Sequence, residues 1–273
     1  MTDRYAVIGN PIAHSKSPMI HGAFAQATVQ DIEYIRIEGA DATFNAQVDE
    51  FRKTGGLGMN VTAPFKLRAF EIATDRSERA QSAGAVNAMK FESGRIYAEN
   101  FDGIGLTNDI QRNLGFPMAG RRILMLGAGG AARGALSTFL EQGPATLLVI
   151  NRTQEKAQRL AREFSACGAV SAGTIGDLES LEFDIVINAT SASLNGELPS
   201  IPPGAFADGS LAYELVYGKG LTPFLRLAQS AGAMQIADGV GMLVEQAAEA
   251  FEWWRGVRPD TKALIRQMTV PLV

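Results

Sequence analysis

A glycine-rich turn between two apolar segments constrains the fold of this chain more than any other feature. The apolar residues 123–126 are followed at once by Gly127-Ala128-Gly129-Gly130-Ala131-Ala132. This order is typical of a buried strand that turns through a glycine loop into a helix, where backbone N–H groups and the helix dipole face a diphosphate. A second apolar strand at residues 147–150 follows about one helix later, as a βαβ unit requires. The spacing predicts a Rossmann-like parallel sheet that binds a dinucleotide.

The residues at the end of the second strand indicate which dinucleotide binds. An NAD site places Asp or Glu there to accept from the ribose 2′-hydroxyl. Here the strand ends in Asn151-Arg152-Thr153, and Lys156 follows one turn into the next helix. A guanidinium suits a phosphate, and no carboxylate is present to repel it. The alternative is that both cations are solvated helix-start residues, but beside the glycine loop they favour NADP.

Length and composition limit the class of protein. A chain of 273 residues, 46% hydrophobic and 20% charged, is enough for two modest globular domains. A net charge of −4 without a basic cluster argues against nucleic acid as a partner. No apolar run approaches the ~20 residues of a membrane span, and no signal peptide precedes the first strand. The single Cys167 and two histidines predict a cytoplasmic protein with no disulfide and no metal site.

The first hundred residues read as an α/β unit of their own. Apolar strands are expected at residues 5–8, 34–37 and 57–61, with a helix beginning at Ser17-Pro18 and another across 42–53. The segments 86–91 and 95–99 flank Glu92-Ser93-Gly94 and predict a hairpin.

The remainder reads as a nucleotide domain followed by helices. A helix is expected from Asp102 to near Gly115, and strands at 184–187 and 211–215 extend the parallel sheet. The Pro- and Gly-rich residues 199–209 predict a loop. An apolar helix across 239–254 is expected to return to the first domain. The predicted organisation is an α/β substrate domain (1–101), a Rossmann-like NADP domain (102–237) and C-terminal helices packing back on the substrate domain (238–273).

Four polar clusters interrupt the apolar elements of the first domain at their ends, where α/β folds place ligands. They lie at residues 10–17, 60–66, 84–87 and 99–103. Their hydroxyls and amides, with one lysine and one aspartate, suit a small polyhydroxylated substrate whose hydroxyls must each find a partner. Taken singly, each cluster also fits a capping or turn role, and Ser17 in particular is expected to cap the helix that Pro18 begins.

These motifs together resemble the shikimate dehydrogenase family. The resemblance rests on Gly9-Asn10-Pro11-Ile12-Ala13-His14-Ser15-Lys16-Ser17-Pro18, on Asn60-Val61-Thr62-Ala63-Pro64-Phe65-Lys66, on the glycine loop and on Asn151-Arg152-Thr153. It continues through Asn188-Ala189-Thr190-Ser191, Thr222-Pro223-Phe224-Leu225 and Asp238-Gly239-Val240-Gly241-Met242. It covers the whole chain in order. It implies a two-domain oxidoreductase of aromatic amino acid biosynthesis (the chorismate route) that interconverts shikimate plus NADP with 3-dehydroshikimate plus NADPH.

The resemblance also assigns residues. Lys66 matches the catalytic lysine of the family and Asp102 its partner aspartate. The matches to substrate-binding positions are Ser15, Ser17, Asn60, Thr62, Asn87, Tyr217 and Gln246. The matches to cofactor-binding positions are Glu78, Gly127, Ala128, Gly129, Gly130, Ala131, Asn151, Arg152, Thr153, Lys156, Thr190, Leu215 and Gly239.

Two residues depart from the family pattern. Phe101 stands where family members usually have threonine, directly before Asp102, and Ala88 stands where threonine is usual after Asn87. If the Phe101 ring faces the substrate, one hydrogen bond of about 0.5–1.5 kcal/mol is lost. Both departures bear on substrate identity and turnover rather than on the reaction class.

The residue patterns do not decide which group transfers the proton. They also leave two alternative functions open. Because a lysine is ordinarily protonated at neutral pH, either Lys66 is the base and Asp102 orients it, or Asp102 relays the proton while Lys66 polarises the oxygen. One alternative is a divergent member acting on quinate or another cyclic hydroxy acid, and another is a non-catalytic NADP-binding sensor. A monomer or a homodimer is expected.

Overall fold

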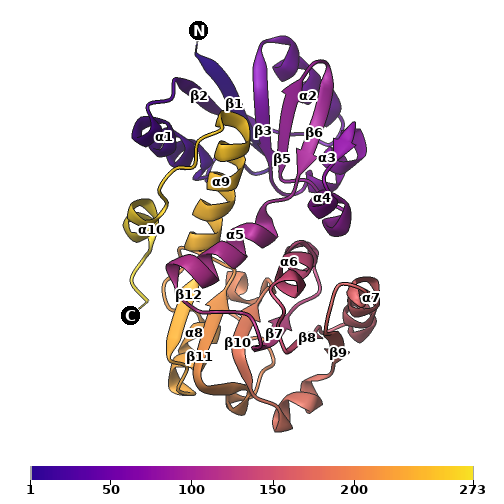
Figure 1. The fold of residues 1–273 in the computed structure, drawn as a ribbon, viewed down its shortest axis with the longest axis vertical. Helices are drawn as coiled ribbons and strands as arrows, with labels where there is room; N and C mark the ends of the chain where they lie inside the picture. Colours follow the sequence, from indigo (N-terminus) through magenta and orange to yellow (C-terminus); the bar gives the residue numbers. More distant parts are fainter. Residues whose placement is uncertain (1, 273) are drawn as a thin grey trace. The chain divides into compact units, whose positions relative to one another are not determined.

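The computed structural model describes residues 2–272 and divides the chain into two compact units. Unit 1 comprises Met1–Gly105 with Val244–Leu264, and unit 2 comprises Leu106–Leu243 with Ile265–Val273. Figure 1 labels the elements of each unit, which are described separately below. Among residues 2–272, no helix combines the length and the apolar character that a membrane span needs.

Unit 1 is built on a mixed six-stranded sheet of order β2-β1-β3-β5-β6-β4. Strands β1, β2 and β3 are mutually parallel where they pair, and β5 then runs antiparallel to both β3 and β6. The elements are β1 (Asp3–Gly9), α1 (Ser17–Thr28), β2 (Ile32–Glu38), α2 (Phe44–Lys53), β3 (Gly56–Val61), α3 (Lys66–Ile72), β4 (Asp75–Arg76), α4 (Glu78–Ala83), β5 (Ala88–Glu92) and β6 (Arg95–Glu99). The α/β unit expected for the first hundred residues is confirmed.

The predicted hairpin is present between β5 and β6. Ser93 and Gly94 have φ values of 50° and 77°. Such left-handed pairs match the twist of a two-residue hairpin, so the short turn brings the start of β5 and the end of β6 to the same edge of the sheet.

Unit 2 is built on a fully parallel sheet of order β12-β11-β10-β7-β8-β9. Read from β9, this is the doubly wound order in which the strand order reverses between β7 and β10, and ligands bind at that switch point. The elements are β7 (Arg122–Leu126), α6 (Gly130–Glu141), β8 (Thr146–Ile150), α7 (Gln154–Phe164), β9 (Val170–Gly173), β10 (Phe183–Asn188), β11 (Phe206–Glu214), α8 (Pro223–Ser230) and β12 (Gln235–Asp238). The predicted Rossmann-like sheet is confirmed.

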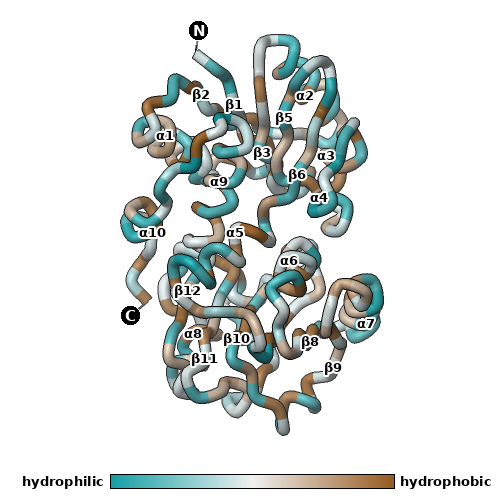
Figure 2. The backbone as a smooth tube through the Cα atoms, in the orientation of Figure 1, coloured by the Kyte–Doolittle hydropathy of each residue, from teal (hydrophilic) through white to brown (hydrophobic). Residues whose placement is uncertain are grey.

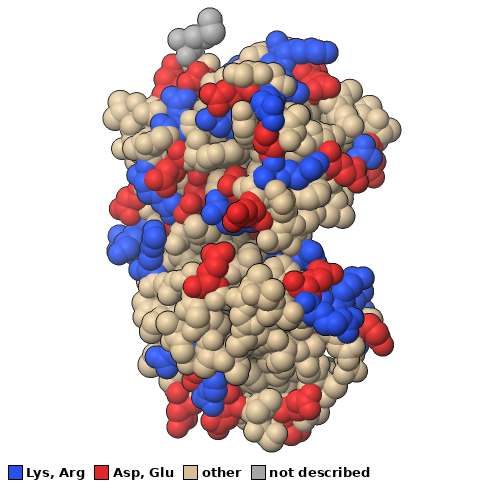
Figure 3. Space-filling view, turned by 45° about the vertical axis from the view of Figure 1, so that its right-hand side comes forward, with Lys and Arg blue, Asp and Glu red and all other residues tan. Residues whose placement is uncertain are grey.

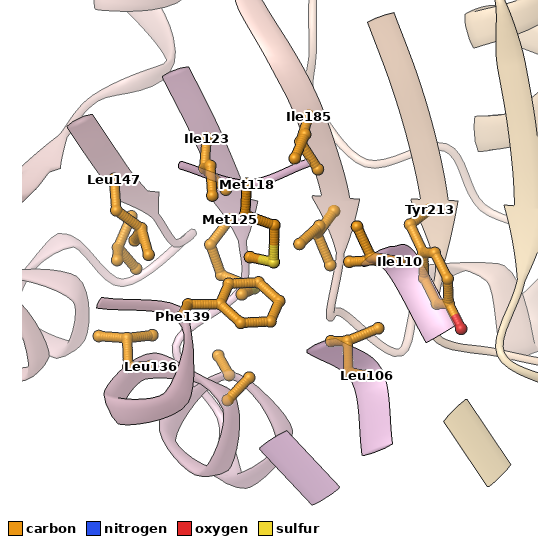
Figure 4. Packing of buried hydrophobic residues seen from close by; sticks show 14 of the residues in the cluster. Leu106, Ile110, Met118, Ile123, Met125, Leu136, Phe139, Leu147, Ile185 and Tyr213 are labelled. Atoms are coloured by element: carbon orange, nitrogen blue, oxygen red, sulfur yellow. The ribbon is translucent and has the colours of Figure 1, made fainter. Parts of the chain in front are cut away.

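The core of unit 2 lies between the sheet and its helices. Phe139 of α6 is fully buried against Met125 and Ile185 of the strands, in the cluster drawn in Figure 4. Figure 2 shows the contrast between a buried strand and a helix with an exposed face, since β8 is coloured as hydrophobic and much of α7 as hydrophilic. Burial of this apolar surface fixes the sheet and therefore the positions of the loops at its carboxyl edge.

Three helices lie where the chain passes from one unit to the other. They are α5 (Asp102–Asn108), α9 (Val240–Arg255) and α10 (Lys262–Met268). The expected helix from Asp102 continues as a π-helical turn, Asp109–Asn113, before Gly115. Within unit 2 the buried Asp109 accepts from Tyr213 Oη at 2.7 Å and from Asn113 Nδ2 at 3.0 Å. In unit 1 the residues of α9 pack on the sheet, where Trp254 Nε1 donates to the Met89 carbonyl at 3.1 Å.

The loop expected across residues 199–209 is too long by four residues. Phe206 to Gly209 belong to β11, since Phe206 pairs with Phe183 of β10. The ladder is irregular between Phe183 and Ile185, and Gly209 has a φ of 75°. A glycine in this conformation lets the strand bulge and continue, so the Gly-rich composition marks an irregular strand.

Candidate functional site

The polar clusters of unit 1 meet at one edge of its sheet. β1 and β3 are parallel, with Ile8 opposite Val61, so both strands end at this edge. β5 begins there, because Asn60 of β3 lies opposite Ala88. β6 ends there too, with Glu99 opposite Ala88. The segments that follow β1, β3 and β6 and the one that precedes β5 therefore converge, as their positions at strand ends predict.

An ammonium–carboxylate pair lies at this edge. Lys66 is the first residue of α3, and its Nζ is 2.5 Å from Asp102 Oδ2 at the start of α5. The Lys66 side chain is 32% exposed and the Asp102 side chain 13% exposed. The structure thus brings together two groups 36 residues apart in the sequence and leaves the amine accessible to a small molecule.

Two asparagines fix the carboxylate and the start of α5. Asn87 Nδ2 donates to Asp102 Oδ1 at 2.9 Å, so both carboxylate oxygens of Asp102 have a partner. Asn87 Oδ1 accepts from the Phe101 N–H at 2.9 Å. Asn100 Oδ1 accepts from the Asp102 N–H at 3.1 Å, and Asn100 Nδ2 donates to the Ala85 carbonyl at 3.0 Å. The catalytic candidates are therefore held by amides that are themselves fixed by the backbone.

The remaining substrate-binding candidates of unit 1 lie at the same edge of the sheet, and Asn60 and Gln246 belong to the Asn87 network. Asn60 Nδ2 donates to the Asn87 carbonyl at 3.2 Å, and the Thr62 N–H donates to the Ile8 carbonyl at 3.0 Å. Gln246 of α9 accepts from Asn87 Nδ2 at 3.4 Å. The Ser15 hydroxyl donates to Ser17 Oγ at 3.2 Å.

One expectation for this segment is wrong. The N-cap of α1 is Lys16, without a side-chain cap hydrogen bond, and Ser17 is the first helical residue. Pro18 at the first turn has no N–H to satisfy, and the Ser17 N–H donates to Ser15 Oγ at 3.3 Å, so the hydroxyl that meets the start of the helix is that of Ser15.

Two predicted site residues belong to a different unit from the other residues predicted to bind the same ligand. Tyr217, expected to bind substrate, belongs to unit 2 and is 41% exposed. Glu78, expected to bind cofactor, is the first residue of α4 in unit 1.

The glycine loop of unit 2 follows β7 at the switch point. Gly127 has a φ of 108°, and a Cβ there would lie 2.9 Å from the Ala189 carbonyl oxygen at the end of β10. A Cβ on Gly129 or Gly130 would meet nothing within 4 Å, so this side of the loop is open. The helix that begins at Gly130 is 12 residues long. Its first N–H groups have no partner within the helix, as an anion site requires.

The residues after β8 fit a phosphate on the ribose. Asn151 Oδ1 accepts from the Ala128 N–H at 3.2 Å and Asn151 Nδ2 donates to the Thr153 carbonyl at 2.9 Å, which joins this turn to the glycine loop. Arg152 and Lys156 are exposed, and neither side chain has an ion pair among residues 2–272. Figure 3 shows basic side chains gathered with acidic ones over the part of unit 2 that carries α7. Free cations beside the loop match the chemistry of a 2′-phosphate.

The other cofactor candidates of unit 2 also lie at the carboxyl edge of its sheet. Thr190 donates through its N–H and its hydroxyl to Asn188 Oδ1, at 3.1 and 2.7 Å. A Cβ on Gly127 would lie 3.3 Å from Thr190 Cγ2. Gly239 packs so closely on Leu215 that an added Cβ would lie 2.2 Å from its carbonyl oxygen. The glycine loop and Thr190 are thus in contact, and Leu215 and Gly239 form a second contact.

Comparison with known proteins agrees with this arrangement. Family models match the shikimate dehydrogenase substrate-binding domain at residues 7–89, shikimate/quinate 5-dehydrogenase at 110–195 and the shikimate 5′-dehydrogenase C-terminal domain at 239–269. A shikimate dehydrogenase (NADP+) of Chromobacterium violaceum is 54% identical over 268 residues, which are 98% of each chain. The chain belongs to the shikimate dehydrogenase family.

Solved structures extend the likeness to three dimensions. An Ael1 enzyme from Pseudomonas putida is 61% identical, with a TM-score of 0.96 and full coverage of both chains. Shikimate 5-dehydrogenase from Thermus thermophilus, solved with NADP(H) and shikimate, is 30% identical, with a TM-score of 0.88 over 98% of this chain and 100% of that one.

The two departures from the family pattern share one environment. Phe101 is 3% exposed and Ala88 fully buried, and both belong to a hydrophobic cluster with Tyr5, Ala250 and Trp254. The Phe101 ring also makes an edge contact with the Trp253 ring, with centroids 5.8 Å apart. The ring therefore packs in the core of unit 1, and at position 101 it is the backbone N–H that takes part in the polar network.

Two further residues support the site without belonging to any of the sequence motifs. Glu214, the last residue of β11, is fully buried and accepts from Asn188 Nδ2 at 2.9 Å and from the Ser193 hydroxyl. Burial raises the pKa of Glu214. Tyr34 of β2 donates to Asn60 Oδ1 at 2.6 Å. A carboxylate at the end of a mostly buried strand needs a partner, and that is the signal in the sequence that points to Glu214, whereas β2 is half-buried to exposed and gives no such signal for Tyr34.

Proposed function

We propose that this chain is an NADP-dependent oxidoreductase that interconverts shikimate and 3-dehydroshikimate at a secondary alcohol. The Lys66–Asp102 pair carries the proposal, because its 2.5 Å contact lies among the hydroxyl and amide groups of the sheet edge. A purely binding protein has no need of a titratable pair there. Membership of the family and the cations beside the glycine loop support the same reaction and cofactor.

The residues of unit 1 bind and orient the substrate and exchange its proton. NADP+, when bound, supplies the hydride acceptor. We assign the proton to the Lys66–Asp102 pair acting as a unit: in ketone reduction the Lys66 ammonium gives a proton to the substrate oxygen, and in alcohol oxidation the resulting neutral amine takes the hydroxyl proton back, with Asp102 Oδ2 beside Nζ stabilising the charged form. Asn87 Nδ2 holds the other carboxylate oxygen, so Asp102 stays directed at the amine. Ser15, Ser17, Asn60, Thr62 and Gln246 offer the hydrogen-bond partners that a polyhydroxylated acid needs.

In unit 2, we propose that the glycine loop and the start of α6 bind the diphosphate. Arg152 and Lys156 bind the 2′-phosphate, with Asn151 and Thr153 fixing their turn. Thr190, Leu215 and Gly239 line the remainder of the cofactor site, with Glu78 and Tyr217 as further binding residues. We also propose a cytoplasmic location and a monomer or homodimer.

The test is turnover followed through NADPH formation with shikimate as substrate. Lys66→Met should lower kcat by about 10²–10⁴, the usual contribution of an acid–base group. Lys90→Met is the matched control, because Lys90 is also a lysine of unit 1 but pairs with Glu92 at 3.3 Å. A Lys66→Met variant that changes only KM would exclude the catalytic role.

Quinate is the second candidate substrate. The model that matches residues 110–195 describes both shikimate and quinate enzymes. A panel of cyclic hydroxy acids, each assayed with NADP+ and with NAD+, separates the two. No turnover with any of them, despite tight NADPH binding, would instead indicate the non-catalytic sensor.

A further inference from the structure

A buried carboxylate lies behind the cofactor candidates of unit 2. Glu214 is the last residue of β11 and lies opposite Asn188, the last residue of the neighbouring strand β10. Both residues are fully buried, although they stand at the carboxyl edge of the sheet, where the glycine loop follows β7. A buried carboxylate is costly unless it is hydrogen-bonded, so the partners of Glu214 indicate what it contributes.

Four donors surround the Glu214 carboxylate. Oε2 accepts from Asn188 Nδ2 at 2.9 Å, from the Thr222 hydroxyl at 3.3 Å and from the Ser193 hydroxyl, and Oε1 accepts from the Val216 N–H at 3.2 Å. The Ser193 oxygen also accepts from Asn188 Nδ2, at 3.3 Å, which leaves the serine proton for Glu214. Burial raises the pKa of Glu214, and these hydrogen bonds oppose the rise. The surroundings therefore suit an ionised carboxylate that accepts from every side.

Glu214 sets the orientation of the Asn188 amide. An ionised carboxylate can only accept, so Asn188 Nδ2 must face Glu214 and Oδ1 must face away from it. Oδ1 there accepts from the Thr190 N–H at 3.1 Å and from the Thr190 hydroxyl at 2.7 Å. These bonds fix Thr190 with its methyl group toward the glycine loop, since Cγ2 would lie 3.3 Å from a Cβ on Gly127. The carboxylate thus acts on Thr190 through Asn188.

The same carboxylate fixes the segment that follows β11. Oε1 accepts from the Val216 N–H, two residues further along the chain, and so closes a turn around Leu215. The Leu215 N–H donates to the Asn188 carbonyl at 3.0 Å. One oxygen of Glu214 therefore acts on the segment after β10, and the other acts on the segment after β11.

These two segments lie on one side of the switch point. The sheet order places β10 and β11 on one side of β7, whereas β8, which Arg152 follows, lies on the other side. The proposed function assigns the diphosphate to the loop after β7 and the 2′-phosphate to the turn after β8. A dinucleotide bound across the switch point would then extend its nicotinamide half toward the segments after β10 and β11.

We propose that Glu214 is a positioning residue that holds the segments at Thr190 and Leu215 in place for the nicotinamide half of NADP. The inference rests on the proposed function, which supplies the dinucleotide. A segment that is already fixed in its bound conformation loses less entropy when the ligand binds, so positioning by Glu214 contributes to the affinity for the cofactor.

The first test compares Glu214→Ala with Asp184→Ala by calorimetric binding of NADP+. Asp184 is the matched control, because it lies near the start of β10, at the opposite edge of the same sheet, and accepts from the Arg122 N–H at 2.7 Å and from the Arg122 guanidinium at 2.9 Å. Both substitutions remove a carboxylate that joins neighbouring strands, so both should lower Tm. Only Glu214→Ala should raise the dissociation constant of NADP+, by about tenfold.

A fragment of the cofactor separates positioning from general damage to unit 2. Adenosine 2′,5′-bisphosphate carries the 2′-phosphate but lacks the nicotinamide half. Its dissociation constant should therefore stay within about twofold of the wild-type value in Glu214→Ala. If NADP+ and the fragment weaken equally, Glu214 supports the whole sheet and the positioning role is wrong.

Glu214→Gln repeats these measurements with a side chain of the same size, so a Glu214→Ala variant that fails to fold does not end the test. The amide oxygen of the glutamine can still accept from Asn188, but its NH2 group then faces the Val216 N–H. The affinity for NADP+ should lie between those of the wild type and Glu214→Ala. A wild-type affinity in Glu214→Gln, together with one in Glu214→Ala or with failure of that variant to fold, would overturn the proposal.

A double-variant cycle asks whether Glu214 acts through Asn188. Asn188→Ala removes the acceptor of the Thr190 N–H and hydroxyl. In that background, the Glu214 substitution should weaken NADP+ binding by a smaller factor than it does in the wild type. Factors that multiply in the double variant would exclude the path through Asn188.

Binding and turnover of the wild-type protein separate this inference from the proposed function. A wild-type protein that binds NADP+ but does not turn shikimate over contradicts the proposed reaction, and the variants still report on Glu214. A wild-type protein that binds no NADP+ contradicts the proposed cofactor and this inference with it. A wild-type protein that turns shikimate over, with both Glu214 variants binding NADP+ equally well, contradicts the positioning role alone.

Discussion

The two units prepare their sites in different ways. In unit 1 the candidates are side chains that hydrogen-bond to one another or to the backbone, as in the path from Tyr34 to the Asn60 amide, from Asn60 to the Asn87 carbonyl and from the Asn87 amide to Asp102. In unit 2 they are mostly backbone groups, glycines and the exposed cations Arg152 and Lys156. A network of side chains is sensitive to the removal of one group, whereas an open loop is sensitive to the addition of one.

The largest effect is expected from Asp102→Asn in unit 1. The substitution removes the charge that pairs with Lys66 and should lower kcat by about 10²–10⁴. Steady-state kinetics with shikimate and NADP+ measures this. Asp75→Asn is the matched control, because Asp75 and Arg95 pair at the same 2.5 Å on the surface, where Arg95 is 53% exposed. If both substitutions leave kcat unchanged, the Lys66–Asp102 contact is structural only.

Phe101→Thr should reduce stability and leave catalysis intact. Removing a ring from the cluster around Trp254 leaves a cavity. The free energy of unfolding, measured with denaturant, should fall by about 3 kcal/mol. Ala88→Thr alone should overpack the same cluster and lower the free energy of unfolding by about 1–3 kcal/mol. Because the two sites share the cluster, the loss of unfolding free energy in the double variant should be smaller than the sum of the losses in the two single variants. A rise in kcat/KM for Phe101→Thr would show that the ring faces the substrate after all.

Gly127→Ala tests unit 2 by adding a single carbon. The new Cβ would lie 2.9 Å from the Ala189 carbonyl at a φ of 108°, so the loop must shift. We expect KM for NADP+ to rise by about 10–100-fold, or about 1–3 kcal/mol, while KM for shikimate changes little. Gly204→Ala, where nothing lies within 4 Å of the added Cβ, should leave both constants unchanged.

The buried His21 should make unit 1 sensitive to acid. Its ring stacks on Tyr34 with centroids 4.3 Å apart, and both ring nitrogens are buried, with Asn60 supplying the polar interaction that favours the charged ring. Burial lowers the pKa of His21 from 6.5 to about 3. Between these values the unfolded chain binds more protons, so stability is complete above pH 6.5 and falls as the pH decreases toward 3.

Urea unfolding at two pH values measures the contribution of His21. At pH 5 its loss should amount to about 2 kcal/mol relative to neutral pH. His21→Phe should remove this part of the pH dependence, whereas a substitution of the exposed His14 should retain it. Equal pH dependence in wild type and His21→Phe would show that His21 is not the group responsible.

Local patterns in the sequence were sufficient for unit 2 and less so for unit 1. The glycine loop, the strand beside it and Arg152 lie close together along the chain, so their spacing predicts the parallel sheet and the site at its edge. The Lys66–Asp102 contact joins residues 36 apart and needed the family resemblance. The direction of the Phe101 ring depends on how α9 packs in unit 1, which no local pattern encodes. The orientation of the Asn60 amide likewise depends on Tyr34, 26 residues away.

The smallest effect, and the most specific test of unit 2, is expected from Arg152→Gln. The substitution removes one cation that has no ion pair among the described residues. KM for NADP+ should therefore rise about tenfold, since a charged hydrogen bond contributes about 1.5 kcal/mol. KM for NAD+ should not change, because NAD+ has no phosphate at that position. The ratio of the two constants isolates the phosphate contact from any general damage to the loop.

Arg159→Gln is the matched control for this comparison. Arg159 lies on α7, the helix that begins two residues after Arg152, but it pairs with Glu163 at 4.0 Å. Its loss should leave the NADP+ to NAD+ ratio unchanged. If Arg152→Gln weakens both dinucleotides equally, the guanidinium supports the turn around Asn151 and the 2′-phosphate is bound elsewhere. The site in unit 2 would then depend on hydrogen-bonded side chains, as the site in unit 1 does, and the proposed difference between the two units would be wrong.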